Sequence, residues 1–183
     1  EADQETVTRI AAMEGDLSEL NSLVSELLGM ARLDSGQALQ LDAVDVAALL
    51  RSIEASLPPG QPVLAIDCAP DVGTIGADSR LLARALSNLL RNAQKYAASA
   101  IRVTARRDGT RVTISVEDDG PGIPREERER IFEPFYRLDR SRDRATGGFG
   151  LGLSIARKAV LLHGGALQVG DSALGGAQLT VVL

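Results

Sequence analysis

Tryptophan is absent from this sequence, and aromatic residues make up only 3% of its 183 positions. A core must therefore be built mainly from Leu, Val, Ile and Ala, which is feasible because hydrophobic residues make up 44% of the chain. Cysteine occurs once, at Cys68, which excludes an internal disulfide and fits a reducing compartment. Because Cys68 ends a run that reads as a strand, we interpret it as a small buried residue rather than a reactive thiol.

Long apolar runs, a signal peptide and an excess of positive charge are also lacking. No stretch reaches the roughly 18 consecutive apolar residues of a transmembrane helix. The formal net charge of −5 argues against a nucleic-acid binder, whose domain would normally be basic. The chain begins at Glu1, without a methionine and inside a helical pattern, so we expect it to be a fragment of something longer.

The first segment has the clearest periodicity in the chain. Its apolar residues alternate between spacings of three and four, the a/d pattern of a coiled coil: Ile10, Met13, Leu17, Leu20, Val24, Leu27 and Ala31. Such a helix needs a second helix, from this chain or another, to bury its stripe. The spacing favours a bundle or coiled-coil helix over one packed on its own domain, and it predicts a dimer or a swapped assembly.

Turn-forming residues at 34–36 end this helix, and the rest of the chain predicts alternating helices and strands. Residues 119–148 read as a long polar loop with one short helix after Pro124, and loops of that length are commonly lids or disordered segments. The order predicts an α+β fold, with helices on one face of a mixed sheet, preceded by a separate long helix. The expected elements are an extended piece at 39–41, a helix from the cap Asp45 to about Leu57, a strand at 62–68, a helix capped by Asp78 through Ala97, a hairpin of strands 100–107 and 111–118 around Asp108-Gly109, a helix at about 150–162, and strands near 166–170 and 177–183 joined by Gly175-Gly176.

Two asparagines and a lysine share one side of the predicted helix 78–97. Asn88 and Asn92 are four residues apart, and Lys95 follows three residues later. Amide oxygens beside an ammonium suit a polyphosphate with Mg²⁺, which prefers oxygen ligands and keeps substrate phosphates in its shell. An exposed polar helix face is the alternative for this motif alone.

Two further motifs lie at the end of a strand and at the start of a helix. Asp118, followed by Gly120 and Gly122, offers a carboxylate to an exocyclic amine such as that of adenine, although an ordinary acidic turn is the alternative. The run Gly147-Gly148-Phe149-Gly150-Leu151-Gly152 would present free N–H groups to phosphate at a helix N-terminus. It is neither a P-loop, since Gly-Lys-Ser/Thr is missing, nor a dinucleotide fingerprint.

In this order and spacing, the motifs resemble the N box, first glycine box, F box and second glycine box of sensor histidine kinases, within the GHKL group of ATP-binding domains. The resemblance rests on Asn88-x₃-Asn92-x₂-Lys95-Tyr96, Asp118-x-Gly120-x-Gly122, the stretch 132–137, and Gly148-x-Gly150-x-Gly152-Leu153. It covers about residues 37–183 and implies a two-layer α/β sandwich of the GHKL type. Residues 1–36 resemble the second helix of the dimerisation and phosphotransfer domain.

The resemblance implies that the chain binds ATP with Mg²⁺. Asn88 and Asn92 would hold the metal, Lys95 would contact phosphate, Tyr96 would line the nucleotide, and Asp118 would accept a hydrogen bond from the adenine amine. Phe132 and Phe135 would anchor the lid by apolar contact rather than touch ATP. The other expected nucleotide-binding residues are Gly120, Gly122, Ile123, Arg137, Gly148, Phe149, Gly150, Leu151, Gly152 and Leu153, with Arg140, Arg142 and Arg144 as further lid cations.

The phosphoacceptor histidine, which this family carries on the first dimerisation helix, is missing. The sole histidine, His163, ends a helix and resembles a structural position. We therefore expect the chain to bind ATP with Mg²⁺ but not to complete autophosphorylation alone. Its parent would be a bacterial inner-membrane kinase, of which this is a cytoplasmic portion. The expected partners are a second copy through the N-terminal helix, the missing phosphoacceptor helix and a response regulator, without nucleic acid or direct membrane contact.

Other functions remain open from the sequence. A GHKL ATPase would need a general-base carboxylate in the N-box helix, but the residue four positions before Asn88 is Arg84, and no acid lies between Asp78 and the end of that helix. A serine kinase acting on an anti-sigma partner would lack the heptad helix. A module that only binds nucleotide or dimerises is the alternative for the chain as it stands.

Overall fold

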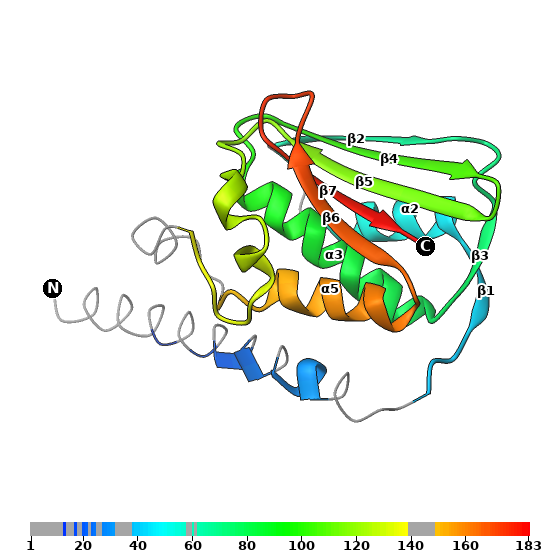
Figure 1. Cartoon of the computed structure of the whole chain (residues 1–183), viewed down its shortest axis with the longest axis horizontal. Helices are drawn as coiled ribbons and strands as arrows, with labels where there is room; N and C mark the ends of the chain where they lie inside the picture. The colour runs from blue at the N-terminus through cyan, green and yellow to red at the C-terminus, as the bar shows by residue number, and fades with distance from the viewer. Residues whose placement is uncertain are drawn as a thin grey trace, which may run out of the picture.

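The computed structural model describes residues 13, 17, 20, 21, 23, 24, 27–31, 38–57, 60, 62–138 and 149–183. Its long helices α3 and α5 lie on one face of a five-stranded sheet, as Figure 1 shows. This arrangement confirms the predicted α+β fold. The elements are β1 (Asp42–Asp45), α2 (Val46–Ser56), β2 (Val63–Cys68), β3 (Thr74–Ala77), α3 (Ser79–Tyr96), β4 (Ala100–Asp108), β5 (Arg111–Asp118), the 3₁₀ helices η1 (Arg125–Glu127) and η2 (Arg130–Phe132), α5 (Gly152–Leu162), β6 (Ala166–Asp171) and β7 (Ala177–Val182).

The main sheet has the order β2-β4-β5-β7-β6 and is mixed, because β2 and β4 are parallel and the other pairs are antiparallel. The parallel pair is joined by a crossover that includes α3. β4 and β5 form the predicted hairpin, in which Asp108 pairs with Arg111 and Gly109 adopts a φ of +58°. This hairpin leaves Asp118 at the far end of β5, next to the start of β4.

The core lies between the sheet and the helices. Helix α3 begins where Asp78 accepts hydrogen bonds from the backbone N–H groups of Arg80 and Leu81, which confirms the predicted cap. Its apolar stripe faces the sheet and is buried, at Leu82, Ala85, Leu86, Leu89, Leu90 and Ala93. Alternate residues of the central strands meet that stripe: Ile101, Val103, Ala105, Val112, Ile114, Val116, Leu179 and Val181.

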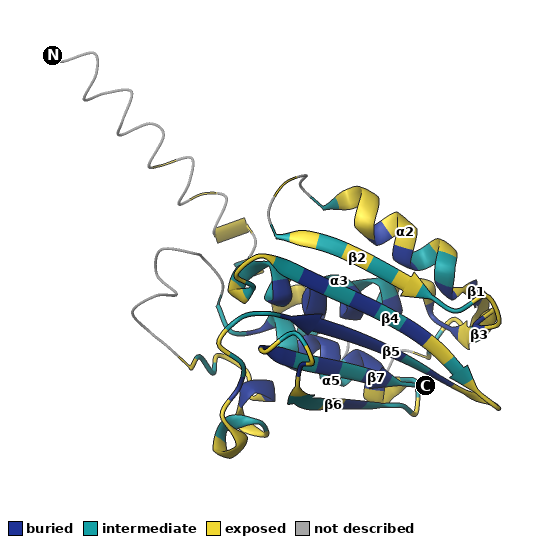
Figure 2. Ribbon diagram, turned by 90° about the horizontal axis from the view of Figure 1, so that it is seen from above, coloured by how far each residue is buried: buried dark blue, intermediate teal, exposed yellow. Residues whose placement is uncertain are grey.

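The opposite face of the sheet carries polar side chains. Ser115 and Thr180 share a hydroxyl hydrogen bond of 3.0 Å across β5 and β7, and Arg102 lies 3.9 Å from Glu117 across β4 and β5. Figure 2 shows this face in front of α3 and α5, with exposed and half-buried residues along β2 and β4. Cys68, at the end of β2, packs on the core as predicted, but it is half-buried rather than fully buried.

All described residues between 13 and 31 are helical. Leu23 and Met30 pack against Leu151 and Ile155 at the start of α5. Gly29 lies under the Arg84 side chain of α3, since a methyl group at Gly29 would overlap the guanidinium. The helix therefore contacts α3 and α5 through a face that the heptad pattern did not predict.

The predicted heptad seam points away from that contact. Ile10 lies outside the described residues, and the others are exposed: Met13, Leu17, Leu20, Val24, Leu27 and Ala31. The seam is not covered by the described part of this chain, so its pairing with a second helix remains a prediction. No described helix combines the length and the apolar character needed to cross a membrane.

Three sequence-based expectations were wrong in detail. The extended piece expected at 39–41 is β1 at 42–45, and its partner β3 was missed, because four residues including Gly76 show no strand alternation. Two 3₁₀ helices, η1 and η2, replace the single helix expected after Pro124. Phe135, expected to anchor the lid by apolar contact, is 59% exposed, whereas Phe132 is buried as expected.

Asp119 joins the α3–β4 corner to the tip of β5. Its carboxylate accepts hydrogen bonds from the backbone N–H groups of Ala98, Ser99 and Ala100, and from the Ser99 hydroxyl at 2.6 Å. The Ser99 side chain and these N–H groups hold the pKa of Asp119 well below its usual range. The neighbouring Asp118 is thereby placed beside the end of α3.

We expect Asp119 to contribute to acid-dependent stability. A lowered folded-state pKa stabilises the protein above the unfolded aspartate pKa of about 3.9. This contribution is lost as the pH falls from that value toward the lower pKa of the folded state. Urea unfolding of the wild type between pH 7 and 3 should show this loss. Asp119→Ala should be less stable at pH 7 and depend less on pH below about 4. The exposed Asp71→Ala is the control, and an identical pH profile for Asp119→Ala and the wild type would contradict the assignment.

Candidate nucleotide site

Helix α3 presents the first motif at the edge of the core. Asn88 is buried, only 5% exposed, while Asn92 and Lys95 are half-buried. The Lys95 Nζ lies 5.1 Å from the centroid of the Tyr96 ring. Asn88 is therefore not part of a solvated helix face.

Asn88 lies where α3 meets the start of α5. A methyl group at Gly152 would lie 3.8 Å from Cγ and from Oδ1 of Asn88, so the two motifs are in contact. The Oδ1 atom accepts a hydrogen bond from Arg91 Nη2, and the Nδ2 atom is buried with no hydrogen-bond partner in the described part of the chain. Leaving a buried polar group unpaired costs about 1–3 kcal/mol, so this amide marks a site that a ligand could complete.

Asp118 is buried at the tip of β5 and is only partly satisfied. It is 3% exposed, and its Oδ1 accepts hydrogen bonds from the backbone N–H groups of Gly120 at 2.9 Å and Ala177 at 3.1 Å. Its Oδ2 accepts no hydrogen bond from the residues that the structure describes. Burial raises the pKa of Asp118, although the two backbone hydrogen bonds act in the opposite direction. The Oδ2 atom can therefore accept a hydrogen bond from an external N–H group.

Glycines let three backbone segments converge on this carboxylate. A methyl group at Gly176 would lie 2.2 Å from Asp118 Oδ1, and one at Gly120 would lie 2.4 Å from the carbonyl oxygen of Tyr96. Gly122, with a φ of +72°, lies against Gly176, and Ile123 after it is buried. The loop after β5 is thus packed between the end of α3 and the β6–β7 turn.

Gly176 and Ala177 are site residues that sequence reasoning missed. The Gly175-Gly176 pair was interpreted only as a turn between strands. Gly176 also donates its N–H to the carbonyl oxygen of Asp118 at 3.1 Å. The paired glycines were a visible signal, but a contact across nearly sixty residues of sequence is not visible from local pattern.

Gly150, just before α5, lies against Phe135 and Tyr136 in the described part of the loop after β5. Its φ is +74°, a methyl group there would lie 2.7 Å from the carbonyl oxygen of Tyr136, and its own carbonyl accepts from the Phe135 N–H at 3.0 Å. Phe135 adopts a φ of +65°, which is strained for a bulky residue. Arg137 is half-buried close by in sequence, whereas Gly148, Arg140, Arg142 and Arg144 lie outside the described residues.

The start of α5 offers backbone N–H groups rather than side chains. The N-cap residue, Leu151, makes no side-chain capping bond, so in the described part of the chain the first N–H groups of this helix and the positive end of its dipole can face an anion. Leu151 is fully buried, Leu153 packs on the main core, and Phe149 packs on Leu151 and Ile155. In this structure Gly152 faces α3, while Phe149, Leu151 and Leu153 pack against other apolar residues.

His163 is engaged at both ring nitrogens. Its Nδ1 lies 2.7 Å from the Ala159 carbonyl oxygen, and its Nε2 accepts from the Asp78 N–H at 2.9 Å. The ring therefore carries its proton on Nδ1 and ties the end of α5 to the start of α3. This geometry supports the structural interpretation of His163.

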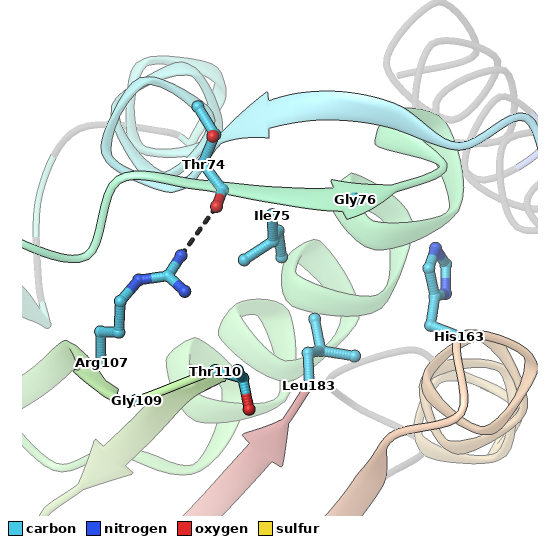
Figure 3. Close-up of a pocket in the computed structure, with 8 residues that line it drawn as sticks. All are labelled: Thr74, Ile75, Gly76, Arg107, Gly109, Thr110, His163 and Leu183. Atoms are coloured by element: carbon cyan, nitrogen blue, oxygen red, sulfur yellow. Dashed lines mark hydrogen bonds between the residues drawn. The ribbon is translucent and has the colours of Figure 1, made fainter.

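His163 also lines a cavity of about 410 Å³, shown in Figure 3, together with Thr74, Ile75, Gly76, Arg107, Gly109, Thr110 and Leu183. Arg107 there donates to the carbonyl oxygens of Val72 and Thr74, both at 2.7 Å. The cavity lies by the β4–β5 turn, whereas Asp118 lies at the opposite end of β5. Its polar groups hold β3 against the hairpin, and none of the expected nucleotide-binding residues lines it.

The residues on α3 fit a hard metal that is held mainly by a nucleotide. The described residues include no group of three or more His, Cys, Asp or Glu side chains arranged as metal ligands. Mg²⁺ commonly keeps water and phosphate oxygens with only one or two protein ligands. The half-buried Asn92 on α3 can supply such an amide oxygen.

Known proteins resemble this chain throughout. The family model described as "Histidine kinase-, DNA gyrase B-, and HSP90-like ATPase" matches residues 77–183. The sensor protein RstB of Escherichia coli K12 is 43% identical over 172 residues, covering 92% of this chain and 40% of RstB. The sensor histidine kinase CpxA of the same strain is 36% identical over 175 residues, covering 93% of this chain and 38% of CpxA. The chain thus spans well under half the length of these curated relatives.

Solved structures agree with this similarity. Full-length ShkA in complex with AMPPNP superposes with a TM-score of 0.76 at 36% identity, covering 89% of this chain and 35% of that one. The mycobacterial sensor histidine kinase MprB superposes with a TM-score of 0.67 at 32% identity, covering 78% of this chain and 96% of that one. The family model and the fold show that the chain belongs to the family of histidine kinase-, DNA gyrase B- and HSP90-like ATPases. Together with the similar sensor proteins, they show that it contains the ATP-binding catalytic domain of a sensor histidine kinase.

Proposed function

We propose that this chain binds ATP with Mg²⁺ between α3, the tip of β5 and the start of α5, and donates the γ-phosphate to a histidine on a dimerisation helix outside the chain. A response-regulator aspartate would then receive the phosphate. The observation that carries the proposal is the contact of Asn88 with Gly152 together with that of Tyr96 with Gly120. Through α3, these contacts connect the asparagine motif, the aspartate motif and the glycine-rich helix start.

Each part of the site would bind a different part of the nucleotide. Asp118 Oδ2 would accept a hydrogen bond from the adenine amine, while Gly120 and Ala177 hold Oδ1. The N-terminus of α5 and the Lys95 ammonium would bind the phosphates, and Asn92 would supply an amide oxygen to Mg²⁺. The metal, when bound, neutralises phosphate charge. The chain itself would act by positioning and charge stabilisation.

We further propose two functional parts. Residues 1–36 would be the second helix of the dimerisation domain, and residues 37–183 the catalytic domain. The exposed seam from Met13 to Leu27 supports pairing with a second copy or with the missing phosphoacceptor helix. The parent would be an inner-membrane sensor kinase, with this portion on the cytoplasmic side.

Hydrolysis of ATP by this site is less well supported. An ATPase of this family would need a carboxylate to activate water, and α3 contains no acidic residue. Asp78 precedes α3 at its other end, and its carboxylate accepts N–H groups of Gln40, Arg80 and Leu81. This carboxylate therefore caps a helix and lies away from the proposed phosphates.

Asp118→Asn tests adenine recognition. Gly120 and Ala177 would hold the carbonyl of the new amide, so its NH₂ group would face the NH₂ group of adenine, and two donors would meet. We expect ATP affinity to fall roughly tenfold or more in a calorimetric titration. Because the pKa of Asp118 is raised, wild-type affinity should also begin to fall at a higher pH than an ordinary aspartate would give, and the variant should lack this dependence. Asp108→Asn, at the far end of the hairpin, is the control; unchanged affinity in Asp118→Asn would remove Asp118 from the site.

Gly176→Ala tests whether the β6–β7 turn positions this carboxylate. The added methyl group would lie 2.2 Å from Asp118 Oδ1, so the carboxylate must move. We expect a several-fold loss of ATP affinity in the same titration, of the size that a disturbed hydrogen bond produces. Gly170→Ala in β6 is the matched control, because its nearest neighbour would be Gln178 Oε1 at 3.8 Å. Equal affinities for the two variants would contradict this role for the turn.

Radiolabelled ATP tests the phosphotransfer. With γ-labelled ATP and Mg²⁺, we expect no stable label on the chain alone, because both His163 nitrogens are engaged. Addition of a fragment that carries the parent's phosphoacceptor helix should place label on that fragment. Stable label on the chain alone that disappears in His163→Gln would overturn the proposal, and absence of label on the added fragment would favour a module that only binds nucleotide.

A further inference from the structure

Asn88 and Arg91 form a pair on α3 that the family motifs do not include. Arg91 Nη2 donates a hydrogen bond to Asn88 Oδ1, one helical turn away. A guanidinium has donors only, so the Asn88 atom that faces Arg91 must be the carbonyl oxygen. The NH₂ group of Asn88 is thereby turned away from Arg91.

That NH₂ group lacks an acceptor. Nδ2 is buried without a hydrogen-bond partner in the described part of the chain, and Asn88 is only 5% exposed. Buried amide donors are nearly always paired in folded proteins, which points to an acceptor supplied from outside. Gly152, at the start of α5, lies against the Cβ, Cγ and Oδ1 atoms of Asn88, so an anion held at this helix N-terminus would lie within reach of the same amide group.

A metal ion does not satisfy these conditions. Mg²⁺ would need the Asn88 oxygen, which already accepts a charge-assisted hydrogen bond. The positive guanidinium beside that oxygen would also repel a divalent cation. A phosphate oxygen, in contrast, is an acceptor and carries the charge that both the NH₂ group and the α5 N-terminus favour.

We propose that Arg91 is a positioning residue that fixes the Asn88 amide with its NH₂ group toward the nucleotide phosphates. Asn88 then donates to a phosphate oxygen, and Asn92 is left as the amide ligand of Mg²⁺. This inference rests on the proposed nucleotide site. The family resemblance implies that Asn88 and Asn92 both hold the metal, whereas this inference assigns the metal to Asn92 and a phosphate oxygen to Asn88. It also assigns a function to Arg91, which no motif identified.

Binding of a non-hydrolysable ATP analogue to the full chain, in Mg²⁺ and in EDTA, separates the two asparagines. Asn88→Ala should weaken binding roughly tenfold in both conditions, because a phosphate contact does not need the metal. Asn92→Ala should weaken it in Mg²⁺ only. A loss in Asn88→Ala that is confined to Mg²⁺ would overturn the proposal.

A double-mutant cycle tests the role of Arg91. Arg91→Met should weaken analogue binding several-fold in EDTA when Asn88 is present, and should have no further effect in the Asn88→Ala background. An equal loss in both backgrounds would mean that Arg91 acts on the nucleotide directly, and no loss in either would mean that it does not position Asn88; both results overturn the proposal. Arg91→Lys, which retains a donor, should recover part of the affinity.

Controls separate this inference from the proposed function. Arg111→Met removes an exposed arginine at the opposite end of β5 and should leave binding unchanged. Arg91→Met should leave the ligand-free protein folded with a cooperative thermal transition, because Arg91 is exposed and the substitution removes only its hydrogen bond to Asn88. Failure of the wild-type chain to bind the analogue would refute the nucleotide site itself, whereas normal wild-type binding with additive Arg91 and Asn88 effects would refute only the positioning role.

Discussion

A buried carboxylate with only one oxygen satisfied is the constraint around which the site is organised. Burial disfavours the ionised form of Asp118, and the backbone N–H groups of Gly120 and Ala177 offset part of that cost. Those N–H groups come from different parts of the chain and can approach closely only because Gly120 and Gly176 lack side chains. The corner tied by Asp119 and the end of α3 complete the same assembly.

Local signals predicted most of the fold. The caps Asp45 and Asp78 and the turn at Asp108-Gly109 are encoded within a few residues, and each was confirmed. The ribbon of β1 and β3 was missed because each strand has four residues and is defined mainly by its distant partner. The face of the N-terminal helix that contacts α3 and α5 was missed for a related reason: the stronger heptad pattern on the other face obscured it.

The sequence predicted which residue types form the candidate site, but not the contacts and the role of each residue. Spacing alone put Asn88 and Asn92 on one side of a helix, yet Asn88 is buried against Gly152 and paired with Arg91. The role of Gly176 depends on a contact made only after β6 and β7 join the sheet. Phe135 combines exposure with a left-handed backbone beside Gly150, to whose carbonyl oxygen it donates its N–H, and neither feature could be predicted from its aromatic character.

The polar outer face of the sheet has a consequence for how this domain is used. Side chains there satisfy one another, as in the Ser115–Thr180 and Arg102–Glu117 pairs, so that surface gains little from being covered. A sheet face whose polar groups are satisfied within the domain needs no neighbour on that side to keep the domain folded. For the phosphate transfer proposed above, the acceptor could therefore approach without displacing a partner from this face.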